Sequence, residues 1–111
     1  MKLLGHPLVG ASWEGFVIEN IFVQLPDHWQ FSYYRSTAKA EIDLILEGPH
    51  KQVLAIEIKR SSAPKLSKGF YYACEEINAT GKYVIYPGKE AFPLRNGVEA
   101  INLESFLHRN H

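Results

Sequence analysis

Apolar and polar residues alternate along two neighbouring stretches of the chain, which predicts a pair of β-strands near its centre. Residues 40–47 place three aliphatic side chains on one face: Ile42, Leu44 and Leu46. Residues 52–60 repeat the alternation with another aliphatic set: Leu54, Ile56 and Ile58. Because the connection through Gly48-Pro49 is short, we expect the two strands to pair in antiparallel fashion.

A helical period precedes these strands and predicts a first helix over residues 7–25, ended by Pro26. Its apolar residues recur every four positions: Trp13, Val17, Ile21 and Leu25. On a helical projection, Ile21 and Leu25 each lie about 20° from Glu14, so Glu14 is predicted in the middle of an apolar face. A lone carboxylate facing a core is costly unless it finds a cation or hydrogen-bond donors, so Glu14 requires an explanation.

The remaining pattern predicts three more strands and two more helices. The strands are expected at 29–35, 82–86 and 98–101, and the helices at 65–79, capped by Gly81, and 103–108, capped by Asn102. A helix joins the 52–60 strand to the 82–86 strand, so these two strands are predicted to be parallel. The chain is therefore expected to be an α/β protein with a mixed central sheet flanked by helices, in the core order α-β-β-β-α-β.

Composition adds bounds to this fold. The chain has 111 residues, of which 46% are hydrophobic and 22% charged, as expected for one globular domain over residues 1–111. No apolar run approaches the ~18 residues that cross a bilayer, and the first residues are too broken for a signal peptide. We therefore expect no membrane association and a cytoplasmic location. A single cysteine, Cys74, excludes an internal disulfide framework.

Charge argues in two directions. Lysine and arginine total 12, as do aspartate and glutamate, and a net charge of zero counts against strong non-specific binding of nucleic acid. However, four cations fall close together with no acid between them: Lys59, Arg60, Lys65 and Lys68. This cluster is either a solvated helix start or a set of contacts to DNA phosphates, and composition favours neither.

The two central strands also carry candidate chemistry. Asp43 and Glu57 lie on neighbouring strands, where side chains on a shared face come within a few ångströms of each other. Mg²⁺ and Mn²⁺ prefer carboxylate and carbonyl oxygens, so the predicted ligands are these two acids and the backbone carbonyl of Ile58. These residue types suit the hydrolysis of a phosphodiester by a metal-bound site. Lys59 shares a face with Glu57 and would orient the water that attacks the phosphodiester and contact its phosphate. Glu14 could supply a further carboxylate, directly or through water.

These residues in this order resemble the restriction-endonuclease-like, or PD-(D/E)xK, nuclease superfamily. The resemblance is carried by Glu14, by Asp43 and by the run Glu57-Ile58-Lys59. The compact size is similar to that of archaeal Holliday junction resolvases, which also place a glutamate on the first helix. The resemblance implies a nuclease-type fold and a metal site at Glu14, Asp43, Glu57 and Lys59. The proline that usually precedes the first acid is replaced here by Ile42.

Longer motifs resemble a domain of unknown function that usually forms the C-terminal part of bacterial and archaeal AAA-type ATPases. The matching segments are WEGFVIEN at 13–20, YRS at 34–36, EIDLI at 41–45, IEIKRS at 56–61 and KGF at 68–70. No G-x-x-x-x-G-K-[ST] phosphate loop occurs, so no ATPase domain is expected within these residues. The resemblance leaves open a stand-alone domain, a part of a larger ATPase, or an ATPase partner in trans.

Two functions of different classes follow. The first is a nuclease that depends on Mg²⁺ or Mn²⁺ and cleaves DNA, with branched and single-stranded DNA among the candidate substrates and a homodimer as one candidate assembly. The second is a catalytically silent module that binds nucleic acid or regulates an ATPase. The intact set of acids and lysine favours the nuclease, whereas the neutral charge and the missing ATPase favour the module.

Overall fold

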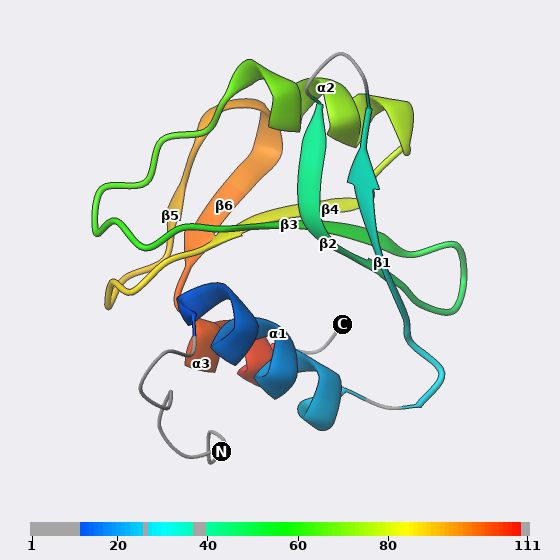
Figure 1. The fold of residues 1–111 in the computed structure, drawn as a ribbon, viewed down its shortest axis with the longest axis horizontal. Helices are drawn as coiled ribbons and strands as arrows, with labels where there is room; N and C mark the ends of the chain where they lie inside the picture. Colours follow the sequence, from blue (N-terminus) through cyan, green and yellow to red (C-terminus); the bar gives the residue numbers. More distant parts are fainter. Residues whose placement is uncertain (1–11, 26, 37–39, 110–111) are drawn as a thin grey trace.

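A mixed six-stranded sheet forms the centre of the computed structural model, which describes residues 12–25, 27–36 and 40–109 (Figure 1). The elements are α1 (Trp13–Gln24), β1 (Gln30–Arg35), β2 (Glu41–Glu47), β3 (Val53–Ile58), α2 (Lys68–Glu76), β4 (Gly81–Ile85), β5 (Phe92–Pro93), the 3₁₀ helix η1 (Arg95–Gly97), β6 (Val98–Ile101) and α3 (Leu103–His108). The strand order is β1-β2-β3-β4-β6-β5. The predicted α/β fold with a mixed sheet is therefore confirmed.

Strand directions follow the predicted connections. Strands β1, β2 and β3 pair antiparallel in turn, while β3 pairs in parallel with β4, and β4 with β6. The parallel strands β3, β4 and β6 therefore end at the same edge of the sheet, which is also the edge where β2 begins. The predicted strand 98–101 and helix 103–108 have the bounds observed. The short β5, which pairs antiparallel with β6, was not predicted.

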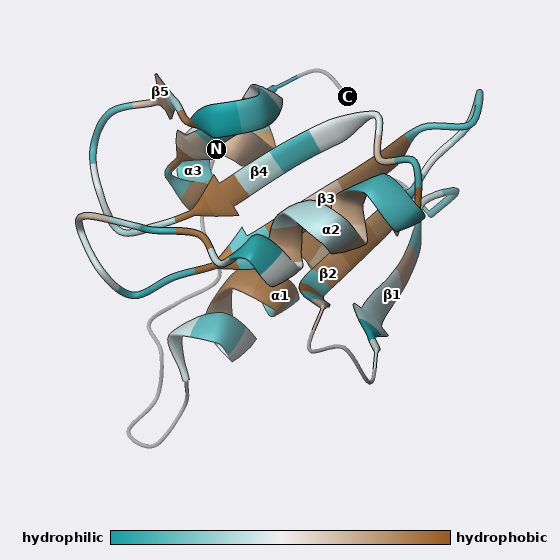
Figure 2. Ribbon diagram, turned by 90° about the horizontal axis from the view of Figure 1, so that it is seen from above, coloured by the Kyte–Doolittle hydropathy of each residue, from teal (hydrophilic) through white to brown (hydrophobic). Residues whose placement is uncertain are grey.

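Helices cover the two faces of the sheet unequally (Figure 1). On one face α1 and α3 lie side by side and enclose the α1–α3 core, whose buried members include Val17, Ile21, Leu44, Leu46, Ile56, Ile58 and Phe106. On the other face α2 lies across the hydrophobic strands β2 and β3 and encloses the α2 core, as Figure 2 shows. The buried members of the α2 core are Ala40, Ile42, Ile45, Ala55, Phe70, Ala73, Cys74, Val84 and Val98.

None of the helices in the described residues is long and apolar enough to cross a membrane. The longest of them, α1, has 12 residues. The predicted start of this helix, residues 7–11, lies outside the described residues. Within them, the Ser12 side chain accepts a hydrogen bond from the backbone N–H of Gly15 at 2.9 Å and begins the helix at Trp13.

Helix α2 begins and ends differently from the prediction. It begins at Lys68 rather than at Lys65, because the Ser67 hydroxyl accepts a backbone hydrogen bond from the first turn. It ends where Asn78 adopts a left-handed backbone with φ of 55°, and the two N–H groups that follow the helix bond back to its last carbonyls as in a Schellman motif. The predicted cap, Gly81, is instead the first residue of β4.

Strand β2 contains one residue more than β1 provides partners for. Two steps along β1, from Ser32 to Tyr34, match three steps along β2, from Ile45 to Ile42. The extra residue falls in the interval that contains Asp43, so the candidate acid lies in a β-bulge. Ile42 consequently packs with Ile45 in the α2 core. The prediction that Ile42 shares a face with the two leucines of this strand is therefore wrong, because the bulge interrupts the alternation.

A tight turn joins β2 to β3. His50 and Lys51 have φ values of 59° and 62°, and the N–H of Gln52 donates to the carbonyl of Pro49 at 3.3 Å. Two consecutive left-handed residues at the centre of a hairpin define a type I′ turn, which favours Asn-Gly. His50 and Lys51 occupy these two positions, where a left-handed backbone is unfavourable for residues other than glycine and asparagine.

Replacing these two residues with His50→Asn and Lys51→Gly should stabilise the protein. We expect the free energy of unfolding to rise by about 1 kcal/mol, because the strain of two left-handed residues is relieved while the flexible glycine offsets part of the gain. Urea unfolding followed by circular dichroism measures this change. The variant Lys51→Ala keeps the strain and should show no gain; an equal gain in both variants would contradict the explanation.

Candidate active site

The candidate residues of β2 and β3 meet at the edge of the sheet where β3, β4 and β6 end. Asp43 lies near the start of β2, and Glu57 and Lys59 lie at the end of β3. In open α/β sheets, ligands commonly bind beyond the carboxyl ends of the parallel strands. The topology therefore gathers the predicted acids and lysine where the fold most readily forms a site.

Asp43 and Glu57 contact each other directly. The Asp43 Oδ2 atom accepts the backbone N–H of Ile58 at 2.9 Å, which fixes the carboxylate between the two strands. Burial raises the pKa of Glu57 to about 9, and both a hydrogen bond with the Asp43 side chain and the negative charge of Asp43 add to the rise, while the positive charge of Lys59 opposes it. A protonated Glu57 can therefore donate a hydrogen bond to the Asp43 carboxylate at this edge of the sheet.

Helix α2 explains why Glu57 is buried. Glu57 alternates with Ala55 along β3, and Ala55 belongs to the α2 core. Only 8% of Glu57 is exposed. The thiol of Cys74 in α2 has its pKa raised to about 11, mainly by burial and in part by the charge of Glu57, so the two side chains are electrostatic neighbours. The prediction that Cys74 is a structural residue of this helix agrees with its burial.

Glu14 approaches from α1 and lies beside Asp43. Together with Arg35 these residues line a hollow of about 350 Å³. Desolvation and then the negative charge of Asp43 raise the pKa of Glu14, while Arg35 opposes the rise. Glu14 was predicted in the middle of an apolar face, and Ile18, Ile21 and Leu25 of that face pack on the core. Glu14 itself is exposed in the first turn of α1, so it does not face the core as a lone carboxylate.

The three acids do not form one cluster. Among the residues that the structure describes, no group of three or more aspartate, glutamate, histidine or cysteine side chains is placed to hold a metal ion. The structure instead pairs Asp43 with Glu57 and places Glu14 in a hollow with Asp43 and Glu41, whose charges both raise the pKa of Glu14. A carboxylate pair fits Mg²⁺, which commonly uses one or two carboxylates and completes its shell with water and phosphate oxygens. Metal binding by Asp43, by Glu57, by Glu14 and by the carbonyl of Ile58 stays a prediction.

The backbone of Lys59 is held from two sides. Its N–H donates to the carbonyl of Ile85 at 2.9 Å, which extends the pairing of β3 with β4 by one residue. Its carbonyl accepts the indole N–H of Trp13 at 2.9 Å, which ties the end of β3 to the start of α1. These two hydrogen bonds fix the backbone from which the side chain of Lys59 extends, two residues after Glu57 along the chain.

The predicted DNA contacts Arg60, Lys65 and Lys68 are all exposed. Lys65 and Lys68 border two hollows beside α2, and Arg95 lines both hollows. Arg95 had not been selected from the sequence, because it lies 27 positions after Lys68 and joins the group only through the turn before β6. Contact of these cations with DNA stays a prediction.

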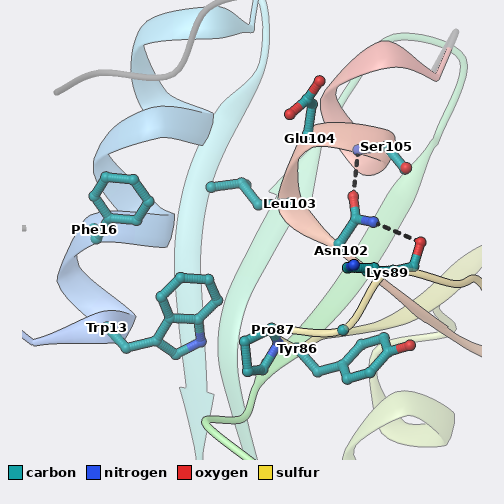
Figure 3. Close-up of a pocket in the computed structure, with 10 residues that line it drawn as sticks. Trp13, Phe16, Tyr86, Pro87, Lys89, Asn102, Leu103, Glu104 and Ser105 are labelled. Carbon is teal, nitrogen blue, oxygen red and sulfur yellow. Dashed lines mark hydrogen bonds between the residues drawn. The ribbon is translucent and has the colours of Figure 1, made fainter. Parts of the chain in front are cut away.

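A second cavity at the same edge was missed by sequence analysis (Figure 3). It has a volume of about 540 Å³ and is lined by Trp13, Phe16, Tyr86, Pro87, Gly88, Lys89, Asn102, Leu103, Glu104 and Ser105. Asn102 shapes one wall, since its amide donates to the carbonyl of Lys89 at 3.1 Å and accepts the N–H of Ser105 at 2.7 Å. The only sequence signal was the prediction that Asn102 caps α3, which is confirmed.

Two curated mycobacterial proteins are similar to the chain. They are the Uncharacterized protein Rv2008c of Mycobacterium tuberculosis and the Uncharacterized protein Mb2031c of Mycobacterium bovis, each 34% identical over 107 residues. The match covers 96% of this chain but 24% of each relative. The chain thus spans about a quarter of the length of these relatives.

A solved structure shares the fold at low sequence identity. It is a chain in the refined half-complex from a tetradecameric assembly of Thermococcus gammatolerans McrB AAA+ hexamers with bound McrC. The likeness has a TM-score of 0.51 and 13% identity, and it covers 81% of this chain and 27% of that chain. Residues 9–106 also match the family described as Domain of unknown function (DUF4143), and the chain therefore belongs to the DUF4143 family.

Proposed function

We propose that this domain hydrolyses phosphodiester bonds of DNA, with Mg²⁺ or Mn²⁺ held by Asp43 and Glu57. The observation that carries the proposal is the hydrogen-bonded pair of carboxyl groups at the sheet edge, with Glu57 buried. Two carboxylates in contact repel each other unless a proton or a cation lies between them. A site that holds a proton in this position can therefore exchange it for a divalent ion, and the ion's preference for oxygen ligands matches the pair.

Each neighbouring side chain has a role in this proposal. Lys59 lies on the strand face of Glu57, so its ammonium group can contact a phosphate oxygen and orient a water molecule. The two hydrogen bonds that fix its backbone restrict where that ammonium group can go. Glu14, in the hollow it shares with Asp43, would accept a proton from the attacking water. When bound, the divalent ion would neutralise phosphate charge and lower the pKa of that water.

The second candidate is a module that binds or regulates without turnover. The neutral net charge favours it, as does the lack of a three-ligand cluster among the described residues. In either case we propose that the domain works with an AAA-type ATPase. The short span of the chain relative to its curated relatives leaves room for one, and the similar fold occurs in an assembly that contains AAA+ hexamers.

Cleavage assays separate the two candidates. We expect the protein to cleave at least one of supercoiled plasmid, single-stranded DNA and branched DNA with Mg²⁺ or Mn²⁺ but not with EDTA. Lys59→Gln, which removes the charge and keeps the stem, should slow cleavage by about 100-fold, the effect expected of a group that orients the reacting water. The matched control Lys51→Gln, in the turn before β3 and so beyond the other end of that strand, should cleave like wild type.

Two results would reject the nuclease proposal. Failure to cleave any of these substrates with either ion would favour the binding or regulatory module. Equal losses in Lys59→Gln and Lys51→Gln would show that net charge, and not the residues at the sheet edge, controls the reaction.

A further inference from the structure

We propose that the cavity in Figure 3 binds an unpaired nucleobase of the DNA strand held at the Asp43–Glu57 edge. This inference rests on DNA being the substrate in the proposed function. The cavity volume of about 540 Å³ lies in the range of ~300–1,000 Å³ that holds small ligands in proteins. It is large enough for a flat heterocycle and is open to solvent at its rim, where exposed Lys89 and Glu104 lie.

The cavity adjoins the candidate site through α1. Trp13 lines the cavity and Glu14, the next residue, lines the hollow that contains Asp43. The indole N–H of Trp13 donates to the carbonyl of Lys59, so the cavity wall and the candidate lysine are joined by one hydrogen bond of 2.9 Å. A DNA strand whose phosphate lies at Asp43 could therefore place a neighbouring base in the cavity.

The chemistry of the walls suits a base better than a phosphate. The rings of Trp13 and Phe16 stack with centroids 5.9 Å apart and planes 26° apart, and both residues line the cavity (Figure 3). Bases stack on aromatic rings with little dependence on sequence, because every base has a π-face. The carboxylate of Glu104 at the rim would repel a phosphate but can accept a hydrogen bond from the exocyclic amino group of a base. Lys89 supplies a cation at the rim for the DNA phosphate next to the bound base.

The cavity would also select the form of the DNA. A base inside a duplex is stacked on its neighbours, and it presents a face to a protein ring only after it leaves the stack. Single-stranded DNA and the unpaired positions of branched DNA provide such bases without this cost. The proposed ligand is therefore an unpaired nucleotide, recognised through its ring.

Phe16→Leu and Phe22→Leu form a matched pair for a test. Both residues lie on α1, and leucine keeps an apolar side chain while removing the ring. Phe16 lines the cavity, whereas Phe22 is 66% exposed and packs on Phe31 of β1, with ring centroids 5.3 Å apart. Fluorescence anisotropy with a labelled oligonucleotide, measured in EDTA so that no cleavage occurs, gives the affinity of the 111-residue chain. Thermal unfolding confirms that each variant is folded.

We expect Phe16→Leu to weaken binding of single-stranded DNA by about tenfold, the loss typical of one stacking contact, and Phe22→Leu to leave it unchanged. An oligonucleotide of the same length that lacks bases should bind wild type and Phe16→Leu equally. Unchanged affinity of Phe16→Leu for single-stranded DNA would overturn the inference, as would an equal loss with the abasic strand or with duplex DNA.

The same preparations distinguish this inference from the proposed function. Metal-dependent cleavage by wild type, combined with unchanged binding by Phe16→Leu, would reject the base-binding cavity and retain the nuclease. A base-dependent loss of binding in Phe16→Leu, combined with no cleavage by wild type, would support the cavity and reject the nuclease.

Discussion

Glu57→Gln should make the metal-free protein more stable above about pH 5 and should remove its response to divalent ions. The pKa of Glu57 is raised to about 9 in the folded protein, from the ordinary value of 4.5 for a free side chain. Between these values the folded chain binds more protons at this carboxyl than the unfolded chain does. The stability that the protonated group provides is therefore complete at low pH and is lost as the pH rises toward 9.

The free energy of unfolding is expected to depend steeply on pH. The free energy of unfolding should fall by up to about 1.4 kcal/mol for each pH unit in this window, since one pKa unit corresponds to that amount. Glutamine resembles the protonated glutamate, so Glu57→Gln keeps a donor toward Asp43 without the cost of ionisation. At neutral pH the advantage of the variant should reach about 2 kcal/mol or more.

Urea unfolding of wild type and Glu57→Gln at several pH values in EDTA measures this difference. The two curves should converge near pH 4.5 and separate as the pH rises. With Mg²⁺ or Mn²⁺ at about 100 times its Kd, wild type should gain about 2.7 kcal/mol and the variant should gain nothing. The control Glu47→Gln, an exposed residue at the other end of β2, should leave both the pH dependence and the ion response unchanged. Parallel curves for wild type and Glu57→Gln would contradict the raised pKa of Glu57.

A pair of acids that lowers stability at neutral pH is more often placed by function than by folding. Asp43 and Glu57 occupy positions where two apolar residues would pack without an electrostatic cost. Carboxyl groups with strongly shifted pKa values are common at functional sites for this reason. The bulge in β2 also supports a functional role for this pair, since bulges commonly change the direction of a side chain next to a site.

Most of the fold could be predicted from local patterns, and the exceptions have identifiable causes. The alternation over residues 40–47 predicted β2 with almost its observed bounds, Glu41–Glu47, but a period of two cannot reveal an inserted residue, so Ile42 was assigned to the wrong face. The start of α2 was misplaced because the residues before Ser67 fit a helical period equally well. Strand β5 consists of Phe92–Pro93 and is too short to show any period.

The candidate site was predictable only where it depends on paired strands. Asp43 and Glu57 are neighbours because β2 and β3 form a hairpin, and a hairpin fixes its own register. The exposure of Glu14 depends on where the first turn of α1 lies over the sheet, which no local pattern specifies. The cavity beside Trp13 is built from three segments, and their approach results from the packing of α1 and α3 on the sheet.

Phe70→Ala should be the most destabilising of the substitutions considered. Phe70 is fully buried and is the largest side chain of the α2 core, whose other buried members are alanine, valine, isoleucine and cysteine. These small neighbours cannot move far enough to fill the space of a ring, so the variant should lose about 3–5 kcal/mol of stability. A loss of this size is a large fraction of the total for a domain of this length, which is about 5–15 kcal/mol.

The matched control is Tyr72→Ala on the same helix. Tyr72 is 62% exposed, so its loss should change stability by about 0.5 kcal/mol or less. Urea unfolding of the two variants gives the comparison. Equal costs for Phe70→Ala and Tyr72→Ala would show that α2 does not depend on the buried ring for its attachment to the sheet.

The milder substitution Phe70→Leu connects this core to the carboxyl pair. Because α2 covers Glu57, a looser α2 should admit water and lower the pKa of Glu57 from its raised value. We therefore expect the stability difference between Glu57 and Glu57→Gln at about pH 8 to be smaller in the Phe70→Leu background than in wild type. An unchanged difference would mean that contact with Asp43, and not burial under α2, is what holds the proton on Glu57.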